Sequence, residues 1–389
     1  MPATTKLEVT ARNNAVQIGP HLTITFKRTL RIPDDGKLYP LPPSLGNFPV
    51  HRIDDYRSNV PEAWRDHGGV FLPMWQREAM WLAFNGAQFR PYALKVAVGK
   101  VNALSGEPYD QQLHGAGGRD ETQDYMVVPG QPWLDGINVG DGIIRQFVAM
   151  PLGGGHTVEG QVTGEELFGG VQLVAFDTKE GRFPTRAPQS PLRRARLRSA
   201  GQHTNSSGSG AFSGPSFKTL AASHSDFPEM LAATDLLATR GMSPTAPIAA
   251  EMGLGAGGQM EQKIYPDPHG LDVWDTDRFG RVYVHLVNSQ MYREITGRPA
   301  PPSPVDPQVY ARHGYPWFEM YDEGCGDIPA STVLGGVKSV KEVDEDKGMY
   351  DGQDDTTVWI PGSQVHPVFK QPPVAGWPKD PHAVSDHGW

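Results

Sequence analysis

Residues 131–159 are the stretch of the sequence whose side chains are best suited to bind a polar ligand. The candidate binding residues are Trp133, Asp135, Asn138, Asp141, Arg145, Gln146, His156 and Glu159. The indole of Trp133 could stack on a sugar ring while Asp135 and Asn138 bond its hydroxyls. Loops held by a rigid sheet commonly carry such groups. We therefore take these residues as a candidate ligand site.

The same stretch also has a structural interpretation. Its Asp-Gly pairs, at 135–136 and 141–142, are typical of hairpin turns. Trp133 would then anchor the loop in the core instead of facing a ligand. Turn chemistry accounts for most of these residues, so the structural interpretation is the favoured one.

Carboxylates and one histidine offer a catalytic alternative. Glycoside hydrolysis needs only two carboxyl groups at a suitable separation, and no sequence motif has to reveal them. Asp135, Glu159, Glu165 and Glu166 lie near His156 in the sequence. The alternative function is therefore a hydrolase that acts on glycans or other polar substrates through carboxylates.

A GxGxxG pattern at Gly253, Gly255 and Gly258 matches the fingerprint of a dinucleotide-binding loop. That site needs a buried strand before the glycines, a helix after them and an acid about 20 residues further on. The preceding residues IAAEM make a poor strand, and QMEQKIY is cut short by Pro266. We therefore predict a glycine-rich turn here.

Other motifs for catalysis or metal binding are missing from the sequence. It contains no GxxxxGK[ST], GxSxG or HExxH pattern and no Cys/His set with zinc spacing. Cys325 stands between acidic residues, which disfavour a reactive thiolate. The acidic groups 272–277 and 344–355 lack EF-hand spacing and suit solvated loops. No cofactor or metal follows from the sequence, and whether the protein is an enzyme stays open.

Composition restricts the partners and the compartment. A net charge of -9 repels phosphate backbones, so nucleic acid is not an expected partner. The single cysteine favours a reducing compartment, and the N-terminus lacks the apolar segment of a signal peptide. The sequence contains no run of 18 apolar residues, so membrane insertion is not expected. We expect a cytoplasmic protein whose partner is a small molecule, a glycan or a protein, and which could form a homo-oligomer.

Periodicity and turn signals predict the elements that must position these residues. The chain holds 45 Gly and 36 Pro, which favours turns over long helices. Strands are predicted at 21–32, 92–98, 124–128, 143–150, 158–163, 170–176, 281–287 and 356–360. Helices are predicted at 61–64, 73–84, 227–240 and 306–313. The fold class is therefore mainly β, with sandwich- or barrel-like sheets, a few short helices and long Gly/Pro-rich loops.

A change of composition divides the chain. Residues 180–226 are rich in Pro, Arg, Ser and Gly, which is typical of a flexible linker or a long excursion. We predict a β-rich N-terminal half (1–179) and a mixed α/β C-terminal half (227–370). Residues 371–389 are a Pro-rich tail.

Three segments together carry a family resemblance. They are QPWLDGINVGDGIIRQFVAMPLG at 131–153, VTGEE at 162–166 and GLGAGGQMEQKIY at 253–265. As a set they resemble a family of bacterial and fungal proteins of uncharacterised function. The resemblance implies no activity. With catalytic signatures missing and shaped loops abundant, the sequence favours a binding or assembly role.

Overall fold

A computed structural model describes residues 6–115, 123–187, 251–302, 317–320, 326–349 and 365–368. Residues 186–247 form a unit of their own, and the account below concerns the other unit, which contains the remaining residues. The predicted elements at 227–240, 306–313 and 356–360, the tail 371–389 and Cys325 lie outside the described residues.

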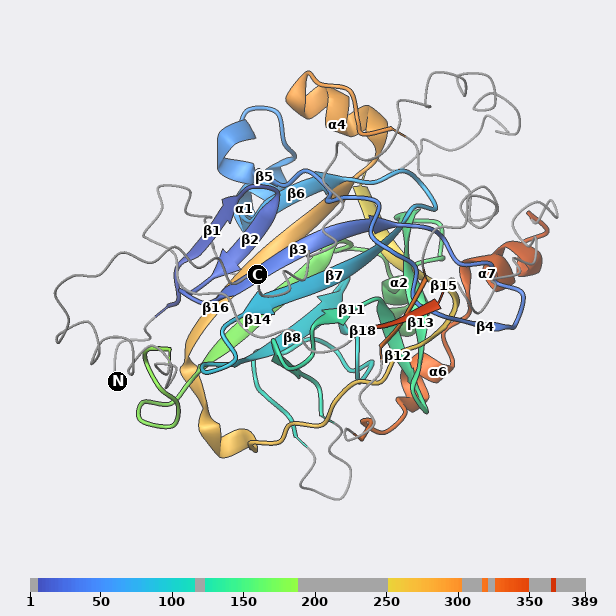
Figure 1. Cartoon of the computed structure of the whole chain (residues 1–389). Helices are drawn as coiled ribbons and strands as arrows, with labels where there is room; N and C mark the ends of the chain where they lie inside the picture. Colours follow the sequence, from blue (N-terminus) through green and yellow to red (C-terminus); the bar gives the residue numbers. More distant parts are fainter. Residues whose placement is uncertain are drawn as a thin grey trace, which may run out of the picture. The chain divides into compact units, whose positions relative to one another are not determined.

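Strands dominate the described residues (Figure 1). They are β1 (Val9–Arg12), β2 (Ala15–Ile18), β3 (Leu22–Thr29), β4 (Leu38–Tyr39), β5 (His51–Arg52), β6 (Val70–Pro73), β7 (Ala79–Gly86), β8 (Tyr92–Val98), β9 (Val101–Asn102), β10 (Met126–Val128), β11 (Trp133–Leu134), β12 (Gly136–Gly140), β13 (Ile143–Pro151), β14 (Val171–Thr178), β15 (Glu251–Glu261), β16 (Trp274–Val287), β17 (Trp317–Met320) and β18 (Val365–Val368). The helices are η1 (Ile53–Tyr56), α1 (Glu62–His67), α2 (Val158–Thr163), η2 (Leu271–Val273), α4 (Ser289–Thr296), α6 (Thr332–Gly335) and α7 (Val340–Asp346). The predicted mainly β class is confirmed.

Sixteen of the described strands form one sheet. Its main path runs β1-β2-β3-β7-β13-β15-β16-β14-β8-β10, and its pairs are antiparallel except β4 with β15 and β6 with β16. The β1–β2 end of this path folds back over β16, because Leu7 N donates to Phe279 O and a Cβ on Gly280 of β16 would lie 2.6 Å from Ile18 of β2. One main hydrophobic core lies between the two layers, as in a sandwich.

Alternation along β3 and β7 explains why each has a core face and an outer face. Leu22, Ile24 and Phe26 of β3 are fully buried in the main core, and the residues between them face the other way. By contrast, all seven residues of β8 are buried, in keeping with its central apolar run. The predicted strand at 21–32 and most of the other strands are therefore confirmed.

The predicted helix at 73–84 is wrong. Residues 79–86 are strand β7, which pairs with β3 from Leu22↔Gly86 to Thr29↔Ala79. Met80, Leu82 and Phe84 point into the core with a period of two, which is the period of a strand. Packing against the neighbouring strands stabilises this arrangement more than helix propensity would stabilise a helix. The four residues before it make a turn, in which Glu78 N donates to Trp75 O and Arg77 has a φ of 67°.

The predicted strand at 158–163 is also wrong, because these residues form helix α2. The Thr157 side chain caps the helix by accepting from Gly160 N, and Gly164, in the left-handed region, ends it. The N-cap and the glycine stop were therefore stronger local signals than the apparent alternation.

The glycine-rich segment at 253–258 is neither a turn nor a nucleotide loop. It lies inside β15, which pairs with β13 along its length. A Cβ on Gly255 would lie 2.6 Å from His156 O, and one on Gly258 would lie 2.4 Å from Pro33 O. These glycines therefore let two neighbouring segments pack directly on the strand.

Strands from both sides of residues 180–226 belong to the same sheet. β14 pairs with β16 and β13 pairs with β15. The predicted boundaries themselves stay a prediction, since 188–250 lie outside the described residues. Among the helices that the structure describes, none has the length and apolar character needed to cross a bilayer.

Candidate functional site

Asp135, predicted to bind a ligand, is buried between β11 and β12. Its backbone N donates to Gln262 Oε1 at 3.0 Å, and Gln262 Nε2 donates to Asp135 Oδ2 at 2.9 Å. Burial raises the pKa of Asp135 to about 7, although the bond from Gln262 acts in the opposite direction. This carboxyl group ties β15 to the β11–β12 connection and offers no surface to a ligand.

Asn138 and Gln146 are likewise buried and engaged with the backbone. Asn138 Oδ1 accepts from Gly140 N at 3.1 Å. Gln146 accepts from Ile32 N at 2.8 Å and donates to Leu30 O at 2.7 Å. Their amides satisfy backbone groups that strand pairing leaves open.

Asp141 occupies the turn between β12 and β13. Its φ is 55°, and Gly140 and Gly142 on either side also have positive φ, as a tight hairpin requires. The side chain of Asp141 is exposed. Its place in the molecule is that of a turn residue.

Glu159 binds a loop of its own chain. Its carboxylate accepts from the backbone N of Leu167, Phe168 and Gly169, each at 2.8 Å. Glu166 returns the contact by accepting from Gly155 N and Thr157 N. These two carboxylates hold the ends of α2, and their acceptor capacity is largely used.

His156 and Arg145 both meet helix α7. His156 Nε2 lies 2.9 Å from Asp344 Oδ1, and Arg77 donates to the other oxygen of Asp344 at 2.7 Å. Burial lowers the pKa of His156 more than the bond to Asp344 raises it. Arg145 pairs with Glu342 at 2.9 Å. Two of the predicted residues, His156 and Arg145, thus both contact helix α7, which the sequence analysis did not connect with them.

Trp133 lies on the outer face of the sheet and its companion is Trp81. Their ring centroids are 6.0 Å apart and their planes are inclined by 60°. Trp133 pairs with Ala83, two residues along β7 from Trp81, so both rings project from the same face. Both side chains are partly exposed. Of the predicted residues, Trp133 alone is placed as a stacking platform would require.

Cross-strand register defines the rest of this surface, which we call the tryptophan face. Its three rows are Gln17, Thr23 and Asn85; Ala15, Thr25, Ala83 and Trp133; and Asn47, Lys27 and Trp81. Lys27 Nζ donates to Asn47 Oδ1 at 2.7 Å and lies 6.0 Å from the centroid of the Trp81 ring. The face therefore combines two indoles with amides, hydroxyls and one ammonium group.

Two buried polar atoms of the tryptophan face have no hydrogen-bond partner among the residues that the structure describes. They are the hydroxyl of Thr25, a residue only 9% exposed, and the indole nitrogen of Trp81. A buried polar atom without a partner costs about 1–3 kcal/mol, so such atoms call for an explanation. Both atoms have almost no solvent-accessible surface, so they lie beneath the face and are not contact points for a ligand.

Sequence reasoning missed Trp81 because it assigned the residue to a helix. The available signal was the period of two, in which Met80, Leu82 and Phe84 alternate with Trp81 and Ala83.

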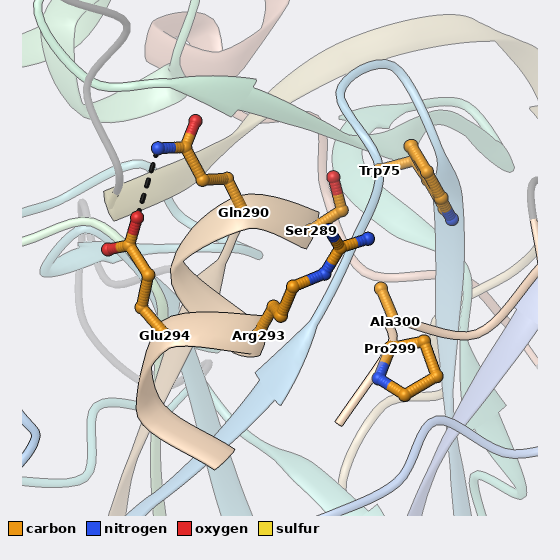
Figure 2. Close-up of a pocket in the computed structure, with 7 residues that line it drawn as sticks. All are labelled: Trp75, Ser289, Gln290, Arg293, Glu294, Pro299 and Ala300. Atoms are coloured by element: carbon orange, nitrogen blue, oxygen red, sulfur yellow. Dashed lines mark hydrogen bonds between the residues drawn. The ribbon is translucent and has the colours of Figure 1, made fainter. Parts of the chain in front are cut away.

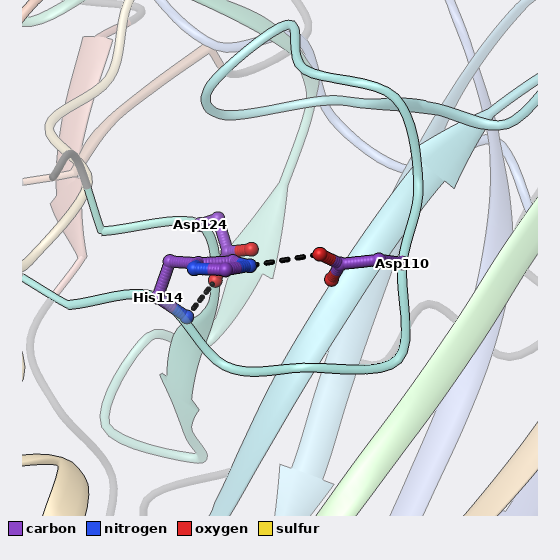
Figure 3. A group of neighbouring side chains, drawn as sticks. All are labelled: Asp110, His114 and Asp124. Carbon is purple, nitrogen blue, oxygen red and sulfur yellow. Dashed lines mark hydrogen bonds and ion pairs between the residues drawn. The ribbon is translucent and has the colours of Figure 1, made fainter.

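Asp110, His114 and Asp124 form the one group in the described residues with the geometry of a metal site (Figure 3). His114 Nε2 lies 2.8 Å from Asp110 Oδ2. The buried Lys95, however, places its ammonium 2.8 Å from Asp110 and 2.6 Å from Asp124. The Lys95 ammonium therefore already pairs with both carboxylates, and the group is best understood as an ion-pair network in which Lys95 and Asp124 are buried.

Comparison with known proteins gives no further guide: no family model, curated protein or solved structure matches the chain.

Proposed function

We propose that this protein binds glycans on its tryptophan face. The observation that carries the proposal is the pair Trp81 and Trp133, side by side and partly exposed on the outer side of β7 and β11. Indole rings offer a broad apolar surface at low entropic cost, which suits the C–H faces of sugar rings.

The polar groups around the indoles match the other half of a sugar. Lys27 and Asn47 lie on one side of Trp81, and Thr23 and Asn85 form a more exposed polar row of the same face. Hydroxyl groups of a sugar can both accept and donate, so they could meet these different groups at once.

The shape of the face favours an extended ligand. Ala15 and Ala83 stand between the larger side chains, and the residues come from the four adjacent strands β2, β3, β7 and β11 and from Asn47. Strands lie about 4.8 Å apart, so this surface spans more than one sugar ring. We therefore favour a polysaccharide over a monosaccharide.

Affinity electrophoresis tests the proposal. The full chain would be run through gels containing hydroxyethyl cellulose, xylan, mannan or dextran. We expect at least one polymer to retard the protein, and Trp81→Ala or Trp133→Ala to weaken binding about tenfold or more, as loss of an aromatic anchor does. Trp75→Ala is the matched control, since Trp75 lies outside the tryptophan face, and it should bind like the parent.

Two results would count against glycan binding. One is that none of the four polymers retards the parent protein. The other is that retardation persists in the double variant Trp81→Ala/Trp133→Ala while its melting temperature stays normal.

The alternative, a hydrolase acting through carboxylates, has less support. Glu159 and Glu166 are occupied by backbone N–H groups, and Asp135 is buried against Gln262. Each of these three carboxyl groups accepts hydrogen bonds from a different segment of the chain. The hydrogen bonds therefore indicate structural roles for these carboxyl groups, which favours a binding function over hydrolysis.

A further inference from the structure

A second candidate site lies away from the tryptophan face, beside helix α4. It is a hollow of about 510 Å³, which is within the range of small-ligand pockets. Its lining residues come from the 74–78 turn, from α4 and from the segment that follows α4 (Figure 2); they are Trp75, Ser289, Gln290, Arg293, Glu294, Pro299 and Ala300.

Trp75 is a fixed wall of the hollow. Its backbone N donates to Glu78 Oε2 at 2.8 Å, and Glu78 is buried and paired with Arg28 at 2.6 Å. The indole nitrogen of Trp75 donates to Pro301 O at 2.8 Å, and Arg28 donates to Pro302 O at 2.5 Å. The ring and the proline segment therefore hold each other in place, which lowers the ordering cost of a ligand stacked on the ring.

Helix α4 supplies the polar side of the hollow. Asn288 caps it by accepting from Met291 N at 2.8 Å, while Met291, Tyr292 and Ile295 are buried. This anchoring leaves the polar residues of α4 on the opposite side, toward solvent and the hollow.

Arg293 is the charged group available to a ligand. Within the part of the chain that the structure describes, its guanidinium has neither an ion pair nor a side-chain hydrogen bond, whereas Glu294 accepts from Gln290 at 3.0 Å. Figure 2 shows the Arg293 side chain directed toward Trp75 and Ala300, whereas Glu294, which also lines the hollow, points toward Gln290. An anion beside Trp75 would therefore lie nearer the arginine than the glutamate.

We propose that this hollow binds a planar organic carboxylate, with its ring against Trp75 and its carboxylate on Arg293. A guanidinium matches a carboxylate with two parallel N–H bonds, and the hydroxyl of Ser289 lies in the same hollow as a further donor. An aromatic ring can pack on the indole in an offset-stacked or edge-to-face arrangement. The inference is independent of glycan binding, because it uses none of the residues of the tryptophan face.

The test uses 4-fluorobenzoate as the probe and ¹⁹F NMR line broadening with the full chain. We expect the parent protein to bind the probe, and Arg293→Gln and Trp75→Ala to weaken its affinity about tenfold or more. Arg293→Lys should weaken it less, because lysine keeps the positive charge but cannot make two parallel N–H bonds to a carboxylate. Trp133→Ala is the control and should bind the probe like the parent.

Competition with inorganic phosphate separates a planar-carboxylate site from a general anion site. Weak displacement by phosphate at equal concentration supports the proposal. It is overturned if phosphate displaces the probe as well as benzoate does, if Arg293→Gln binds normally, or if the parent protein does not bind. Because Arg293 is exposed, its variants should fold, and a melting curve checks this.

Discussion

His285 shows how one buried side chain sets the response of this protein to acid. It is stacked between Trp64, at 4.4 Å, and Tyr283, at 4.2 Å, with Nε2 lying 3.2 Å from Gly68 O. Burial lowers its pKa to about 3. The ring is therefore neutral in the folded protein at pH values above about 3.

We predict that His285 makes the protein less stable as the pH falls from about 6.5 toward 3. In that range the unfolded chain binds a proton at this residue and the folded chain does not, so each pH unit costs up to about 1.4 kcal/mol. Urea unfolding at pH 7 and pH 5 checks this. His285→Phe, which keeps a stacked ring, should lose less stability between the two pH values; an unchanged difference would contradict the assignment.

Asp135 should act in the opposite sense. Its folded pKa of about 7 lies above its ordinary value of 3.8, so the folded chain holds a proton that the unfolded chain releases. Stability from this group is present below about pH 4 and is lost as the pH rises through 7. Asp135→Asn keeps the shape and the contact with Gln262. It should flatten this dependence and raise the guanidinium midpoint at pH 8, whereas a lower midpoint there would show that the carboxylate is stabilising.

At the scale of elements, helix α7 is fastened by Asp344, whose partners are His156 and Arg77. Removal of one partner from a buried ion pair costs about 3–5 kcal/mol. We predict that Asp344→Ala destabilises by about 3 kcal/mol and speeds hydrogen exchange at 340–349. Lys338→Gln breaks a pair in which both side chains are 56% exposed, so it should change stability by less than about 1 kcal/mol. Equal exchange in both variants would exclude a role for Asp344 as the fastening.

The glycines of β15 give a second prediction about an element. A Cβ on Gly255 would press on His156 O, a backbone atom that cannot move alone. We expect Gly255→Ala to cost about 1–3 kcal/mol. Gly335→Ala is the matched control, since a Cβ there meets nothing within 4 Å in helix α6 and alanine favours a helix. Thermal melts of the two variants should separate clearly, with the control at or above the parent.

At the scale of the whole molecule, the sheet joins sequence before and after residues 188–250. Eight residues of β14 pair with β16, and β13 pairs with β15 in the same way. We predict that a protease site engineered at Ser207, once cut, leaves two fragments that elute together in gel filtration. Fragments that separate without denaturant would show that the two halves are independent domains.

Much of the fold follows from local pattern. The run YALKVAV gave β8 with the bounds that the structure has, and the alternation in 21–32 gave β3, because burial on one or both faces leaves a direct trace in the sequence. The pattern failed at 73–84, where helix and strand both suit an aromatic run, and only the cross-strand contacts of β7 with β3 decided between them.

The sequence by itself determined the residue types available for binding and the turn chemistry around Asp141. Only the tertiary structure decided their roles. It buried Asp135 against Gln262, paired His156 with Asp344 at a separation of 188 residues, and set Trp133 beside Trp81. The physical reason is that hydrogen bonds and ring contacts form between residues that strand register brings together, and register depends on how whole strands fill the core.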